Sequence, residues 1–117
     1  MTDSTSSTLL RGSVDLLVLR ALAGGEMHGF AMARWIRDRG DDVVSFEDAA
    51  LYQSLHRLQR QELVSSRWGR SENNRRARFY TLTAKGRKQL EARTEEFRSF
   101  ARTMGRLLDR GVEGAGR

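Results

Sequence analysis

The sequence predicts a mainly α-helical fold with one small β-hairpin and a long C-terminal helix, and three observations support this prediction. The segment ALYQSLHRLQRQ has the apolar spacing of an amphipathic helix. Two short alternating segments, LVSSRW and ARFYTL, follow it at once and flank an arginine-rich loop, which predicts a hairpin. A last helix is expected to begin at TAKG. A helix that leads into a basic hairpin is the layout of a winged helix-turn-helix, followed here by a C-terminal dimerisation helix.

Length and charge limit the classes of function. With 117 residues, the chain can bury one modest core and not two. Its net charge is +6, and residues 67–88 hold eight cations against the single acid Glu72, so the rest of the chain nets −1. This uneven distribution favours a polyanionic partner. The absence of cysteine suits a cytoplasmic protein, and no apolar run has the length of a signal peptide or a membrane span, so no membrane partner is expected.

The first helix is expected over residues 14–23, with Ser13 as its N-cap and a disordered polar tail over residues 1–8. This helix is apolar on two faces and must therefore be buried on two sides. Its second face, which includes Leu16 and Leu19, suits a contact with another subunit.

The second helix is expected from about residue 28 to residue 39, and a short extended segment is expected over residues 43–46. The glycine at position 40 ends the helix. The side chains expected to point inward are Phe30, Ala33 and Ile36.

The third helix is expected to be the recognition helix, with Asp48 as its cap. Its core face would be Leu51, Leu55 and Leu58. The opposite face carries Gln53, His56, Arg57 and Arg60. Gln53 and Arg57 are expected to read bases, because glutamine and arginine side chains match adenine and guanine edges in the major groove, although plain solvated surface is the alternative. For Ser54, a phosphate contact and small-residue packing both stay open. Because the helix must stop where the hairpin begins, Glu62 is expected in a left-handed conformation.

The loop between the two strands is the second candidate site. Five arginines lie within residues 67–78, where they would repel one another unless they were neutralised, and DNA phosphates are the natural partner. A merely solvated turn is the alternative. Asn73 and Asn74 tolerate tight turns. The candidate DNA-contacting residues are Tyr52, Gln53, Ser54, His56, Arg57, Arg60, Arg70, Asn73, Asn74, Arg75, Arg76 and Arg78.

The last helix is expected to start after the cap Thr83 and to end near Leu108. Its apolar residues recur every seven positions, as in a coiled-coil seam, although this stripe could also fold back onto its own domain. The chain then divides into a winged-helix DNA-binding domain (residues 9–84), a dimerisation helix (85–110) and a frayed tail (111–117). The candidate dimer-interface residues are Leu16, Leu19, Leu90, Thr94, Phe97, Phe100, Ala101, Met104, Leu107 and Leu108. A two-fold dimer would need a pseudo-palindromic operator.

Enzymatic and metal-dependent functions find no support in the sequence. Neither His28 nor His56 has neighbours with metal-ligand spacing, and no phosphate-binding glycine loop or Ser/His/Asp set is found. We therefore expect no catalysis, no metal and no cofactor. Two other classes stay open besides a DNA-binding regulator. One is a winged helix used as a protein-interaction module, and the other is a basic RNA-binding protein.

Three stretches resemble the PadR family of transcriptional regulators: the HGF segment at 28–30, LY-x-x-LHRL at 51–58 and RFYTLTAKG at 78–86. The resemblance extends over about residues 9–108. It implies a homodimeric winged helix that usually represses its target gene and often responds to a small-molecule effector. The sequence does not identify an effector. This chain departs from the family pattern at Gln53, where proline is usual, and at Ala49 and Ala50, where glycine and a hydroxyl residue are usual.

Overall fold

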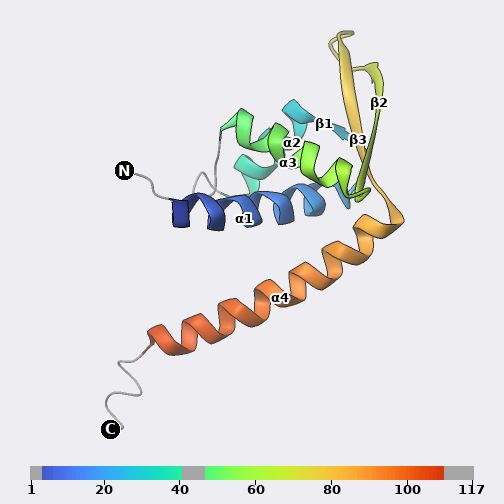
Figure 1. Ribbon diagram of the computed structural model, residues 1–117. Helices are drawn as coiled ribbons and strands as arrows, with labels where there is room; N and C mark the ends of the chain where they lie inside the picture. The colour runs from blue at the N-terminus through green and yellow to red at the C-terminus, as the bar shows by residue number, and fades with distance from the viewer. Residues whose placement is uncertain (1–3, 41–46, 110–117) are drawn as a thin grey trace, which may run out of the picture.

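The computed structural model describes residues 4–40 and 47–109, and within them four helices accompany a three-stranded antiparallel sheet. The mainly α-helical fold with a small hairpin is thereby confirmed. The segment expected at residues 43–46 and the tail expected at 111–117 lie outside the described residues. In chain order the elements are α1 (Ser4–Leu22), β1 (Met27–His28), α2 (Gly29–Arg39), α3 (Asp48–Arg60), β2 (Val64–Arg70), β3 (Arg76–Leu82) and α4 (Ala84–Leu108) (Figure 1).

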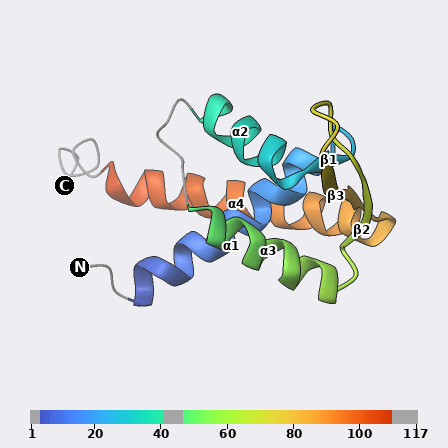
Figure 2. The ribbon, with the colours of Figure 1, turned by 90° about the horizontal axis from the view of Figure 1, so that it is seen from above.

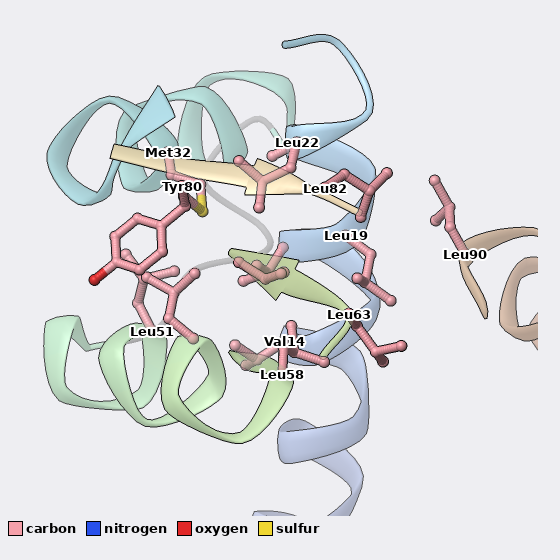
Figure 3. Close-up of a cluster of buried hydrophobic side chains, with 14 residues drawn as sticks. Val14, Leu19, Leu22, Met32, Leu51, Leu58, Leu63, Tyr80, Leu82 and Leu90 are labelled. Carbon is pink, nitrogen blue, oxygen red and sulfur yellow. The ribbon is translucent and has the colours of Figure 1, made fainter. Parts of the chain in front are cut away.

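The core lies between the first three helices and the base of the sheet. Seen from above, α2 and α3 flank α1, and the hairpin rises at one end (Figure 2). The expected core face of α3 is confirmed, since Leu51, Leu55 and Leu58 are all buried. Leu90 reaches into the same cluster from α4 (Figure 3). The buried cluster consists of Val14, Val18, Leu19, Ala21, Leu22, Met32, Leu51, Leu55, Leu58, Leu63, Val64, Tyr80, Leu82 and Leu90.

Helix starts were predicted with mixed success. Helix α1 begins at Ser4, so the assignment of Ser13 as its cap is wrong, and residues 4–8 are helical instead of part of a tail. Serine inside a helix costs only a few tenths of a kcal/mol, roughly, so a packed helix can continue through it. The N-cap of α3 is Glu47, so the assignment of Asp48 as the cap is wrong by one residue. Asp48 lies instead in the first turn, where its carboxylate still faces the positive end of the helix dipole. Thr83 is confirmed as the cap of α4, because its hydroxyl accepts a hydrogen bond from the Gly86 amide at 2.9 Å.

The orientation of α2 was predicted in part. Ile36 is buried as expected, but Phe30 is exposed, and Met32 takes the central core position instead. Met32 and Ile36 are four residues apart and share one helical face, whereas Phe30 lies outside it. The ring of Phe30 instead lies 5.3 Å from the guanidinium carbon of Arg34.

The sheet has the order β1–β3–β2, and the two-residue β1 was not predicted. A strand this short has no readable periodicity of its own and exists only because Met27 and His28 pair with β3. The β2–β3 pairing runs from Val64 opposite Leu82 to Arg70 opposite Arg76.

The junction between α3, the hairpin and α4 is tightly packed. Glu62 adopts a φ of 65°, which confirms the expected left-handed conformation at the end of α3. The next residue, Leu63, accepts a hydrogen bond at its carbonyl from the Thr83 amide at 3.1 Å. That carbonyl lies so close to Gly86 that any side chain at position 86 would collide with it. The start of α4 is therefore fixed against the base of the hairpin.

Candidate nucleic-acid interface

The solvent-facing side of α3 is set by the burial of its leucines. Because residues three and four apart share a helical face, the side opposite the core leucines must face water. Four predicted site residues lie exposed on it: Tyr52, Gln53, His56 and Arg60. The ring of Tyr52 also rests against Gly29, where a Cβ would collide with it. Glycine at the start of α2 thus lets the two helices approach at this point.

Ser54 and Arg57 do not belong to the exposed face, which corrects the sequence-based assignment. Ser54 is fully buried and donates a hydrogen bond to Asp15 of α1 at 2.6 Å. Arg57 donates from Nη2 to the same carboxylate at 2.7 Å and from Nε at 3.4 Å. Their partner lies 39 and 42 residues earlier in the chain, so no local pattern indicates it. The cluster joins α3 to α1 and engages Arg57 in a contact within the chain.

The wing has two chemically different faces, because alternate residues of a strand point to opposite sides. On the side that continues the core face of Val64 and Leu82, β2 contributes Ser66, Trp68 and Arg70, and β3 contributes Tyr80, Arg78 and Arg76. Burial raises the pKa of the Tyr80 hydroxyl at the inner end of this face. This face therefore carries three exposed arginines, Arg70, Arg76 and Arg78, beyond its buried end at Val64 and Leu82.

The other side of the wing is occupied by an internal ion pair. Arg67 donates from Nε and Nη2 to the Glu26 carboxylate at 2.7 and 2.8 Å, and its guanidinium lies 5.1 Å from the Phe79 ring. The Arg67 hydrogen bond lowers the pKa of Glu26. Arg67 is therefore paired within the chain, whereas Arg70, Arg76 and Arg78 lie on the opposite face of the wing.

The wing tip is a tight turn closed by its own backbone. Ser71 and Arg75 are linked by an amide–carbonyl bond of 2.9 Å, and Asn74 adopts a φ of 59°, which confirms that an asparagine here tolerates the turn. Arg70 donates to the Asn74 carbonyl at 3.1 Å. The side chains of Asn73, Asn74, Arg75 and Arg76 are all exposed. The tip therefore presents amides and guanidinium groups to solvent.

Between α3 and the wing lies a cleft of about 520 Å³, and it brings part of the predicted site together. Its walls are Tyr52, His56, Gln59 and Arg60 from α3 and Trp68, Arg78 and Tyr80 from the wing. The Ser66 hydroxyl accepts hydrogen bonds of 3.0 Å from two of these residues, Gln59 and Arg78. Three of these lining residues, Gln59, Trp68 and Tyr80, were not predicted from the sequence. No local pattern in the sequence indicates them, because the cleft exists only where the wing lies against α3.

A second groove, of about 370 Å³, lies between α1 and α4. It is lined by Gly12, Ser13, Leu16, Arg93, Glu96, Phe97 and Phe100. The later part of α4 extends away from the other helices, and Ala101, Met104, Leu107 and Leu108 are exposed on it, while Thr94 is half-buried (Figure 1). Leu19 and Leu90 are instead buried in the core of the chain itself, so their assignment to a surface for a second subunit is wrong.

Two further features were sought within residues 4–40 and 47–109, a metal-binding group and a membrane-spanning helix. No group of three or more histidine, aspartate or glutamate side chains there could hold a metal ion. None of the helices in those ranges is long and apolar enough to cross a membrane.

Comparison with known proteins places the chain in a family. A model of the PadR-like family of transcriptional regulators matches residues 18–92. A transcriptional regulator from Clostridium thermocellum is 25% identical, with a TM-score of 0.76 over 85% of this chain and 96% of that one. A PadR family transcription regulator from Clostridium difficile is also 25% identical, with a TM-score of 0.71 over 81% of this chain and 97% of that one.

The PadR protein of Bacillus subtilis, whose structure was solved in complex with operator DNA, shares the fold at 20% identity. Its TM-score is 0.60, over 67% of this chain and 44% of that one. The family model covers well over half of the sequence, including both α3 and the wing. The chain therefore belongs to the PadR-like family of transcriptional regulators.

Proposed function

We propose that this protein binds double-stranded DNA sequence-specifically as a homodimer and represses transcription from a pseudo-palindromic operator. The observation that carries the proposal is the cleft in which the exposed face of α3 meets the arginine-bearing face of the wing. A recognition helix enters the major groove, and flanking elements contact the backbone. The fold shared with the Bacillus subtilis PadR, which was solved with operator DNA, supports the same class of partner.

The proposed base-reading side chains are Gln53 and Arg60, because both are exposed on α3. The glutamine amide matches the adenine edge, and the arginine guanidinium matches guanine O6 and N7. Tyr52 and His56 are proposed to donate hydrogen bonds to the DNA backbone next to these bases. The residues proposed to neutralise or contact phosphates are Arg70, Asn73, Asn74, Arg75, Arg76 and Arg78. Ser54 and Arg57 are left out, because both are engaged with Asp15.

The homodimer is proposed from the exposed apolar residues of α4. Phe97, Phe100, Leu107 and Leu108 are each at least half exposed, which is unusual for a row of large apolar side chains on one helix. A second copy related by a two-fold axis would cover them on both protomers. Leu16 lines the groove between α1 and α4 together with Phe97 and Phe100, and it would join the interface.

Repression and a response to an effector stay predictions from family membership. A dimer seated on an operator that overlaps a promoter would exclude the polymerase. The groove between α1 and α4 has a volume of about 370 Å³, which is within the range of small-molecule sites.

The proposal is tested by selecting bound sequences from a pool of random duplexes with the full chain. We expect enrichment of a pseudo-palindrome whose half-sites lie one helical turn apart, roughly 34 Å, or a multiple of it. Replacing Gln53 by alanine should weaken binding to the selected site by about 1–3 kcal/mol and random DNA much less. Gln61→Ala, at an exposed position beyond the end of α3, is the matched control.

The competing classes of function give different results. Equal binding of duplex DNA and RNA without enrichment would favour a basic RNA-binding protein. No binding to either nucleic acid would favour a protein-interaction module. Equal losses on selected and random DNA for Gln53→Ala would mean that this residue contacts only the backbone.

A further inference from the structure

Trp68 is a large aromatic side chain on the wing with 52% of its surface exposed. It pairs with Arg78 across the hairpin, so both side chains lie on the face that borders the cleft. The guanidinium carbons of Arg76 and Arg78 lie 4.3 and 5.2 Å from the centre of its ring. These are cation–π contacts, and they hold two flexible cations against one aromatic surface.

The cleft beside Trp68 combines flat apolar surface with positive charge. None of its seven lining residues, all in the described part of the chain, is acidic, and Arg60 and Arg78 stand on opposite walls. The Ser66 hydroxyl links Gln59 to Arg78 and so keeps the two walls in register. A DNA strand alternates an apolar deoxyribose with an anionic phosphate. An apolar indole flanked by cationic guanidinium groups matches this order, with the ring opposite a sugar and the cations opposite phosphates.

We propose that Trp68 is a DNA-contacting residue of this protein. Its ring packs against a deoxyribose of the strand that lies in the cleft, and it positions Arg76 and Arg78 toward the neighbouring phosphates. The inference rests on the proposed DNA-binding function and goes beyond it, because it assigns affinity to an uncharged wing residue.

The alternative is that Trp68 only shields the stems of the two arginines and that the wing acts through charge alone. The two possibilities differ in a measurable way, because replacing Trp68 removes no charge. If charge alone matters, Trp68→Ala leaves both the affinity and its salt dependence unchanged. If Trp68 positions the cations and packs against a sugar, the affinity falls, and the salt dependence becomes shallower because fewer phosphates are neutralised.

The experiment uses the full chain and a fluorescein-labelled duplex of about 24 base pairs, which spans two half-sites one helical turn apart. Fluorescence anisotropy is measured over a series of salt concentrations. For Trp68→Ala we expect binding weaker by on the order of tenfold, because the aromatic surface is removed. The slope of log affinity against log salt should flatten by up to roughly 0.9 for each phosphate that is no longer neutralised.

Two variants serve as controls. Trp68→Phe keeps an aromatic ring and should restore most of the affinity. Trp35→Phe changes the other tryptophan of the chain, which lies on α2 between Arg20 and Arg39, and should leave binding unchanged. In this second variant Trp68 is the sole tryptophan, so its emission should be quenched or shifted when duplex is added. That signal does not depend on whether Trp68→Ala folds.

Each outcome has a definite meaning. If the unmodified chain binds the duplex but Trp68→Ala binds equally, with the same salt slope, the inference is overturned and the proposed function stands. Unchanged Trp68 emission at saturating duplex likewise overturns the inference alone. If the unmodified chain binds no duplex of any sequence, both the proposed function and the inference fail.

Discussion

Replacing Arg57 by alanine should destabilise the fold and should have no selective effect on base recognition. Arg57 Nη2 lies 2.7 Å from Asp15 Oδ1, and the side chains of the pair are only 23% and 13% exposed. A hydrogen bond between charged groups contributes about 1.5–3 kcal/mol, and breaking a fully buried pair costs about 3–5 kcal/mol. Because part of the guanidinium is still hydrated, we expect a loss near the lower range, about 2 kcal/mol.

The measurement is urea unfolding followed by circular dichroism for Arg57→Ala, Asp15→Asn and the double variant. The two single changes should be non-additive by about 1 kcal/mol or more, because both remove the same ion pair. Arg60→Ala is the matched control on the same helix, since Arg60 is exposed and surface changes usually stay within about 0.5 kcal/mol. These four variants and the unmodified protein are then titrated with a selected duplex and with a random one.

Two results would refute the reasoning. The first is an unfolding midpoint for Arg57→Ala equal to that of the unmodified protein. The second is a loss of discrimination between selected and random duplexes in this variant while its stability is kept. Together they would mean that Arg57 leaves Asp15 and reads bases, as the sequence pattern had suggested. The geometry predicts instead that Arg57 contributes to the stability of the fold and that Arg60 contributes to DNA binding.

Three further predictions concern single positions. Glu62→Gly should stabilise the protein by on the order of 1 kcal/mol, because φ is 65° there; a lower melting temperature than that of Glu62→Ala would contradict this. Gly86→Ala should destabilise by about 1–3 kcal/mol, because its methyl group meets the Leu63 carbonyl, and an unchanged denaturation midpoint would count against it. If the proposed dimer forms, Phe97→Glu should convert it to a folded monomer, as judged by sedimentation, and should weaken DNA binding. An unmodified protein that is monomeric at micromolar concentration would refute the proposed dimer.

Local signals in the sequence were sufficient for much of the fold. The spacing of Leu51, Leu55 and Leu58 identified the buried face of α3, because helical periodicity alone decides which side chains share a face. The hydroxyl of Thr83 marked the start of α4, and the abrupt change from helix to strand marked Glu62 as left-handed. These features depend on interactions within a few residues, so the sequence carries them directly.

Only the tertiary structure decided which polar residues of α3 face solvent and which are bound within the fold. The sequence could place Gln53, Ser54 and Arg57 on neighbouring parts of α3, but it could not show that Asp15 lies beside two of them. In the same way, strand alternation could not show that Trp68 borders a cleft with α3 until the hairpin was placed against that helix. A periodic pattern determines which side chains point in the same direction. What they meet there depends on segments about 40 residues away, which only folding brings together.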